Sequence, residues 1–463
     1  MSSAVRTPST TAAGAAALDG DRGFMGHPRG LPLLFLVEMW ERFSYYGMRG
    51  LLVLYLVNSL RWSDADAANL YGTYTGLVYL TPLLGGWLAD RWLGTRRSLV
   101  IGGSVIAAGH FALALPSMAS FYVGLGLIIV GTGFFKPNVS TMVGQLYAEG
   151  DPRRDSGFTL FYIGINLGSF LAALVCGGVA QQFGWHAGFA SAGIGMLLGL
   201  CVYLWGRGRY LAGIGLAPTR AAQGARAETA AREAGAGDWR RVAALLVVFL
   251  FVIAFWAGFE QAGSSMNLFA DRHTDRALGG FQIPTTWFQA INAFAILLFA
   301  PLFAWMWAAL ARRGREPSTP AKMVLGLVLL GLGFAFLAVG GRISDGGVRV
   351  SPVWLLGAYT LHTWGELCLS PVGLSYVTKV APARFASLLM AAWFLANSAG
   401  NKIAGSAAAQ SATMPSGTFF SIFVVSSLGA AALLFFLVPV INRLSTSEPR
   451  PAPLATMNLA ENG

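Results

Sequence analysis

Five polar side chains lie close together in an otherwise apolar stretch near the start of the chain: Glu38, Glu41, Arg42, Tyr45 and Arg49. On a helix with about 100° per residue they share one face, within an arc of about 100°. Carboxylates beside a guanidinium can exchange a proton or hold a charged ligand. A ladder of structural ion pairs would not need two carboxylates beside one arginine. We therefore interpret this stripe as functional.

Four more charged residues stand within apolar segments: Lys136, Glu260, Glu366 and Lys402. A charge in the hydrocarbon of a membrane costs at least about 2.5–3.5 kcal/mol, so such residues usually line a ligand or ion pathway. Lys402 lies nearer a segment end, and we expect its ammonium to reach the membrane interface. His362 stands one helical turn before Glu366, but no third ligand follows at a compatible spacing, so we expect no metal site.

The composition of the chain shows that these charges must lie in a membrane protein. Of 463 residues, 55% are hydrophobic and only 11% are charged, and the mean hydropathy is +0.57. A soluble protein carries about 25% charged residues, which argues against a soluble enzyme or a nucleic-acid-binding protein. The three cysteines lie in apolar segments without CxxC spacing, so we expect small buried side chains rather than a disulfide or a zinc site. We expect the lipid bilayer to be a partner of this protein, and we expect it to bind no nucleic acid.

Twelve segments are long and apolar enough to span a membrane as helices. They lie near residues 31–58, 69–89, 98–115, 119–146, 157–182, 186–206, 240–268, 283–311, 321–341, 351–379, 384–409 and 417–442. The longest polar stretch, 207–239, is rich in Ala, Arg and Gly and is typical of a flexible linker. We therefore predict an all-α integral membrane protein with a tail at 1–30, six-helix halves at 31–206 and 240–443, and a second tail at 444–463.

The basic residues indicate the orientation, because cytoplasmic loops of membrane proteins are enriched in Lys and Arg. With both termini in the cytoplasm, most of the 32 Lys and Arg residues lie on the cytoplasmic side. The outer loops then hold only Arg61, Arg272, Arg276, Arg342 and Arg349. This asymmetry accounts for the net charge of +11 without any nucleic-acid partner.

The direction of each helix gives the depth of its charge. Arg49 and Glu260 lie late in outward-running segments, whereas Lys136 and Glu366 lie past the middle of inward-running ones. We predict two ion pairs between the halves, Arg49–Glu260 on the outer side and Lys136–Glu366 on the inner side. Alternate formation of such gating pairs is what rocking between outward-open and inward-open states requires.

Two six-helix halves around a cytoplasmic linker resemble the plan of the major facilitator superfamily. Residues 85–91 read Gly-Gly-Trp-Leu-Ala-Asp-Arg and are similar to the signature loop of that superfamily. Residues 38–49 read Glu-Met-Trp-Glu-Arg-Phe-Ser-Tyr-Tyr-Gly-Met-Arg. They resemble the ExxERFxYYG signature of the proton-dependent oligopeptide transporter (POT) family. Further segments match that family's pattern: 134–138, 161–169, 255–261 and 365–371.

The resemblance implies a proton-coupled symporter that imports di- and tripeptides across the cell membrane by alternating access. It implies that Glu38, Glu41 and Arg42 couple transport to protons, and we expect protonation of Glu260 to weaken the outer pair. Other positions match residues that bind the peptide: Arg42, Tyr45, Tyr46, Tyr79, Lys136, Asn166, Trp256, Asn292, Glu366, Trp393 and Asn397. Among these, Arg42 and Lys136 would receive the peptide carboxylate and Glu366 its ammonium.

The resemblance also bears on partners and on one departure from the family. We expect a monomer that uses protons as its coupling ion and needs no cofactor. Many bacterial members insert two extra helices between the halves, and the linker at 207–239 is too short and polar to hold them. Those helices lie outside the transport pathway, so no functional residue is put in doubt.

Three other classes of function remain as alternatives. A transporter of the same architecture could carry nitrate, amino acids or drugs, although an anion carrier would not need Glu366 opposite a basic cluster. A membrane-embedded enzyme would want a catalytic set such as HExxH or paired intramembrane aspartates, which the segments lack. A sensor would usually carry a soluble output domain. Transport against a gradient by the purified protein would separate these classes.

Overall fold

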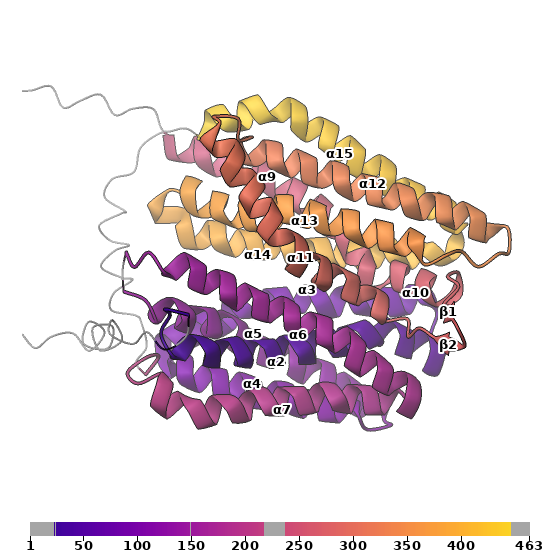
Figure 1. Cartoon of the computed structure of the whole chain (residues 1–463), viewed down its shortest axis with the longest axis horizontal. Helices are drawn as coiled ribbons and strands as arrows, with labels where there is room; N and C mark the ends of the chain where they lie inside the picture. The colour runs from indigo at the N-terminus through magenta and orange to yellow at the C-terminus, as the bar shows by residue number, and fades with distance from the viewer. Residues whose placement is uncertain (1–22, 24, 149, 217–236, 446–463) are drawn as a thin grey trace, which may run out of the picture.

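The computed structural model describes residues 23, 25–148, 150–216 and 237–445, and Figure 1 shows two groups of long helices. The first group consists of α2 (Gly30–Leu54), α3 (Asp64–Leu88), α4 (Thr95–Leu113), α5 (Met118–Gln145), α6 (Arg154–Phe183) and α7 (Trp185–Tyr210). The second consists of α9 (Gly237–Phe259), α10 (Ser265–Arg272), α11 (Trp287–Arg312), α12 (Thr319–Asp345), α13 (Val353–Val380), α14 (Ala386–Ala408) and α15 (Ser416–Ser445).

Short elements connect several of these helices. Two π-helical turns, η1 (Tyr55–Ser59) and η2 (Ala89–Leu93), extend α2 and α3, and 3₁₀ turns lie at η3 (Glu260–Gly263), η4 (Ala383–Phe385) and η5 (Ala409–Thr413). Strands β1 (Ala277–Leu278) and β2 (Phe281–Gln282) form a small antiparallel hairpin. We name the end of the bundle that carries this hairpin the hairpin end. The opposite end, where α7 stops and α9 begins, is the linker end (Figure 1).

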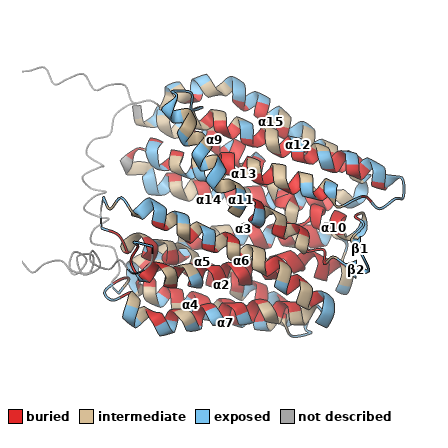
Figure 2. Ribbon diagram, viewed as in Figure 1, coloured by how far each residue is buried: buried red, intermediate tan, exposed pale blue. Residues whose placement is uncertain are grey.

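The predicted all-helical architecture is confirmed by the described residues. Seven helices are long and apolar enough to cross a membrane by length and composition alone. Others, such as α2, have a charged or polar stripe in place of continuous apolar sequence. Outward-facing surfaces carry exposed large hydrophobic side chains (Figure 2), as on α11 at Phe294, Leu298, Leu302 and Trp305. In a membrane protein such surfaces contact lipid, because only satisfied backbone and apolar side chains tolerate hydrocarbon.

The seventh predicted segment, 240–268, is not one continuous helix. Helix α9 ends at Phe259, the turn η3 follows, and the chain resumes as α10. Within this break Gln261 donates its side-chain amide to the carbonyl of Ala404 at 2.9 Å and accepts a hydrogen bond from Ser265 Oγ at 2.6 Å. Ser264 leaves helical geometry, with φ −123° and ψ −95°. Gln261 also donates to the carbonyl of Ala257 in α9 at 3.1 Å, so its side chain binds both the end of the interrupted helix and α14.

Segment boundaries differ slightly from the prediction. Helix α2 begins at Gly30, α7 continues to Tyr210, α9 begins at Gly237 and α15 ends at Ser445. The linker predicted at 207–239 is therefore shorter, and its central part, 217–236, lies outside the described residues, as do most of the tails predicted at 1–30 and 444–463. Cys176 and Cys368 are buried as expected, but Cys201 is exposed.

Helix α2, which carries the stripe of acidic and basic residues, is held in close contact with α6. A Cβ added at Gly168 on α6 would lie 2.1 Å from the backbone oxygen of Met39 and 3.1 Å from Cβ of Arg42. Only glycine allows this approach, which explains why the segment 161–169, which matches the family's pattern, carries glycine at position 168. Close backbone contact at Gly168 therefore helps to position the stripe.

We expect Gly168→Ala to destabilise the fold by about 1–3 kcal/mol, because the methyl group overlaps a helix backbone that cannot move locally. Gly126→Ala on α5 is the matched control, since no atom lies within 4 Å of a Cβ at Gly126. The measurement is the fraction of protein that remains monodisperse in detergent after heating. Equal melting temperatures for the two variants would contradict the proposed role of Gly168.

Candidate functional site

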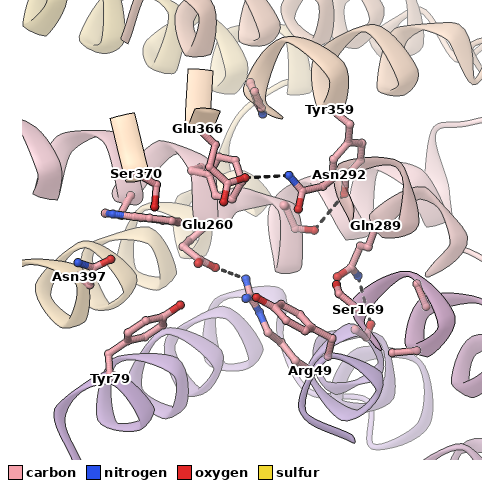
Figure 3. Close-up of a pocket in the computed structure, with 18 of the residues that line it drawn as sticks. Arg49, Tyr79, Ser169, Glu260, Gln289, Asn292, Tyr359, Glu366, Ser370 and Asn397 are labelled. Carbon is pink, nitrogen blue, oxygen red and sulfur yellow. Dashed lines mark hydrogen bonds and ion pairs between the residues drawn. The ribbon is translucent and has the colours of Figure 1, made fainter. Parts of the chain in front are cut away.

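A cavity of about 320 Å³ lies between the two halves. Its walls come from α2, α3, α5 and α6 of the first half and from α9, α11, α13 and α14 of the second half. Figure 3 shows Arg49 and Tyr79 on one side of this cavity and Glu366 and Asn292 on the other. The volume is within the range of sites that bind small molecules, about 300–1,000 Å³.

Lys136 and Glu366 are the two charged cavity residues without an ionic partner among the described residues. The ammonium of Lys136 lies 4.2 Å from the centroid of the Tyr79 ring. Glu366 accepts a hydrogen bond of 3.0 Å from Asn292, which also donates to Thr363 Oγ1 at 2.9 Å. The first half thus offers a cation and the second a carboxylate to the same cavity.

Arg49 and Glu260 form an ion pair that joins the halves on the hairpin side of the cavity. Their side chains are 8% and 2% exposed. Arg49 also donates from Nε to the hydroxyl of Tyr71 at 2.6 Å. Because a buried ion pair is stable only when its remaining groups are satisfied, Tyr71 supports the contact between Arg49 and Glu260.

The charged triplet on α2 forms a compact cluster. Arg42 binds both oxygens of Glu41, with Nη2 to Oε1 at 2.7 Å, and its Nε lies 3.2 Å from Oε1 of Glu38. All three residues are buried. The second oxygen of Glu38, Oε2, is buried without a hydrogen-bond partner. This carboxylate therefore has one oxygen free to carry a proton, whereas both oxygens of Glu41 are engaged.

Eight of the residues predicted to bind peptide line the cavity: Tyr46, Tyr79, Lys136, Trp256, Asn292, Glu366, Trp393 and Asn397. The side-chain amide of Asn397 donates to the backbone carbonyl of Trp393 at 2.8 Å, so the side-chain oxygen of Asn397 is left for other partners. The indole nitrogen of Trp256 is buried without a partner. The aromatic and amide side chains thus form walls around the two unpaired charges.

Other predicted site residues do not line this cavity. Arg42 is held by its two carboxylates, and Asn166 donates to the carbonyl of Tyr162 on its own helix at 3.0 Å. Tyr45 is 2% exposed and packs edge-on against Tyr46, with ring centroids 5.2 Å apart. Each of these side chains is turned into protein, so a direct contact with substrate would need it to change conformation.

The predicted pair of Lys136 with Glu366 is not formed in this structure. Lys136 lies over the Tyr79 ring, and the hydrogen bonds of the Glu366 carboxylate come from Asn292. The two gating pairs were expected to alternate, and here the pair on the hairpin side is the closed one. The separation of Lys136 from Glu366 leaves both charges available to a ligand.

Contacts at the rim of the hairpin end were missed by sequence reasoning. Asp64 of α3 forms a two-bond ion pair with Arg272 of α10, at 2.5 and 2.8 Å. Asn58 donates to Asp271 at 3.0 Å. These residues stand in polar segments near helix ends, where charges are common, so neither composition nor spacing sets them apart. The sequence analysis also missed five uncharged polar residues of the cavity. They lie within predicted membrane segments, where no charge sets them apart: Tyr162, Ser169, Gln289, Tyr359 and Ser370.

The arrangement can hold a small molecule that carries opposite charges at its two ends. A carboxylate would be attracted to Lys136 and an ammonium to Glu366, and the aromatic walls would accept varied side chains. Such a ligand would touch both halves at once. A bound zwitterion would therefore favour closure of the halves around it.

Comparisons with known proteins give one consistent result. Residues 96–213 and 217–426 match the sequence profile of the POT family. The peptide transporter YePEPT of Yersinia enterocolitica is 39% identical over 92% of this chain and 96% of its own length. A di-/tripeptide transporter of Lactococcus lactis is 36% identical over 83% of this chain and 89% of its own. A crystal structure of a mutant peptide transporter POT in complex with alafosfalin superposes with a TM-score of 0.86 at 36% identity, and covers 94% of this chain and 99% of that one.

Proposed function

Because this chain belongs to the POT family of multi-pass membrane transporters, as its sequence signatures predicted, we propose that it imports di- and tripeptides together with protons. The observation that carries the proposal is the unpaired cation of Lys136 facing the unpaired carboxylate of Glu366 across one cavity. A peptide is a zwitterion whose termini have fixed charges and whose side chains vary. A transporter of many peptides should therefore grip the termini.

The charged triplet on α2 is the proposed site of proton coupling. Glu38 and Glu41 give Arg42 two negative charges for its one positive charge, so the cluster can take up one proton without leaving a buried positive excess. The unpartnered Oε2 of Glu38 is where that proton would reside. Neutralising Glu38 would loosen Arg42 and change the field that Lys136 and its ligand experience. No metal or organic cofactor enters this scheme.

For alternating access, each end of the bundle must be assigned to one side of the membrane. We place the hairpin end outside and the linker end with both termini in the cytoplasm, as the basic residues favour. Closure of the hairpin end by Arg49 and Glu260 then corresponds to an inward-facing state. Protonation of Glu260 from outside would weaken this closure and favour capture of peptide. One chain supplies both halves of the cavity, so we propose that the monomer transports.

Uptake of labelled dialanine into proteoliposomes tests the function. With an inward gradient of one pH unit, peptide should accumulate up to about tenfold for each proton carried, because 1.4 kcal/mol corresponds to a factor of ten. Without the gradient, the internal concentration should only reach the external one. Uptake of nitrate or of a single amino acid in place of dialanine would instead favour a transporter of another solute.

A further inference from the structure

A contact between the halves lies where two cavities meet. Gly177 of α6 and Thr286, the residue before α11, both line the central cavity and both line a second cavity at the hairpin end. This second cavity has a volume of about 280 Å³ and is bounded also by Asn58 and Asp271. The wall between the two cavities at this position therefore consists of Gly177 packed against Thr286.

The packing at this wall leaves no room for a side chain at position 177. A Cβ added there would lie 1.7 Å from Oγ1 of Thr286 and 3.0 Å from its Cβ. Rotating the side chain of Thr286 would move the hydroxyl away but would leave the second overlap in place. Relief of this second overlap requires α6 and the segment that begins α11 to move apart by a few tenths of an ångström.

Hydrogen bonds across the halves hold Thr286 in this position. Its hydroxyl donates to the carbonyl of Ala173 at 3.1 Å, and the adjacent Trp287 donates from its indole to the carbonyl of Leu174 at 3.0 Å. On the other side, Gln289 and Thr286 pack against Gly50 of α2. The start of α11 is thus fixed against α6 and α2 of the opposite half.

We propose that Gly177 and Thr286 form the point at which the central cavity closes toward the hairpin end. Closure is reached because position 177 has no side chain, and the contact separates when this end opens to admit substrate. The proposal rests on the proposed function, since it assumes that the halves part at the hairpin end. It assigns a structural gate that is independent of the ion pair of Arg49 and Glu260.

The test compares Gly177→Ala with Gly178→Ala, because nothing lies within 4 Å of a Cβ at Gly178. Spin labels are placed at the exposed positions Gln182 and Val348, one on each half near the hairpin end, with the three native cysteines replaced by alanine. Distances between the labels are measured in reconstituted protein by double electron–electron resonance. This readout needs no substrate, so it is decisive even if dialanine is not transported.

Gly177→Ala should raise the ratio of open to closed hairpin ends by about tenfold, because the overlap is present only when this end is closed. Gly178→Ala should keep the distribution of the parent protein. Adding Thr286→Gly to Gly177→Ala should lower the ratio again, to about threefold above the parent protein. That change removes every side-chain atom that the new methyl group meets, but it also removes the hydrogen bond to Ala173. A distribution for Gly177→Ala equal to that of Gly178→Ala, or a double variant as open as Gly177→Ala, would overturn the proposal.

A second variant covers the case in which Gly177→Ala does not fold. Thr286→Val keeps the size of the side chain but removes the hydrogen bond to Ala173. We expect a rise of about threefold in the open population, as follows from the loss of one hydrogen bond. An unchanged distribution would show that the contact of Thr286 with α6 does not govern closure.

Discussion

Glu366→Gln should weaken the binding of free dialanine strongly while leaving the binding of N-acetyl-dialanine nearly unchanged. A buried ammonium that loses its carboxylate partner costs roughly 3–5 kcal/mol in a dry site, and less where water remains. We therefore expect a loss of at least about tenfold in affinity for the free peptide. The glutamine can still accept the hydrogen bond from Asn292, so the cavity wall should keep its shape.

The measurement is competition against labelled dialanine, with free and acetylated peptide tested on both proteins. Glu316→Gln is the matched control, because this carboxylate pairs with Lys322 outside the cavity. Lys136→Gln should give the mirror result with a C-terminally amidated peptide. If acetylation weakens binding equally in the parent and in Glu366→Gln, the carboxylate of Glu366 does not contact the amino terminus.

Glu38→Gln and Glu41→Gln should each abolish proton-driven accumulation and retain exchange of peptide. At position 38 an amide cannot take up or release the proton. At position 41 it removes one of the two negative charges, so a proton on Glu38 would leave a buried positive excess. Peptide exchange across the membrane needs no net proton movement. Under an inward gradient of one pH unit, the variants should equilibrate rather than accumulate up to about tenfold per proton. Counterflow of labelled against unlabelled dialanine measures the retained exchange. Accumulation at the parent level by either variant would exclude that carboxylate as a coupling group.

The fold could be predicted almost completely because the signal is physical and continuous along the chain. Apolar runs of about 20 residues mark membrane helices, and the Lys and Arg residues of the loops indicate which side of the membrane each loop faces. The break at Glu260 was missed because the sequence shows no proline there and the segment 240–268 is apolar enough to predict one continuous helix. Gln261 and Ser265 stabilise the break through contacts with each other and with Ala404, which lies far along the sequence.

The site could be predicted only in part. Lys136 and Glu366 stand out because a charge in an apolar segment is costly, but their distance depends on which end of the transporter is closed. Asn166 shares a helix with cavity residues, yet its side chain binds its own backbone at Tyr162. The pair of Asp64 with Arg272 joins residues from polar segments of different halves. Only the assembled structure brings these two together.

The two hydrogen bonds that fix the start of α11 beside Gly177 are asymmetric in kind. The donors are side chains of the second half, Thr286 and Trp287, whereas the acceptors are backbone carbonyls of Ala173 and Leu174 in the first half. Every residue type has such a carbonyl, so a substitution at position 173 or 174 would leave the acceptor itself intact. At this contact the second half therefore supplies the donor side chains, whereas α6 supplies backbone acceptors and a glycine at position 177.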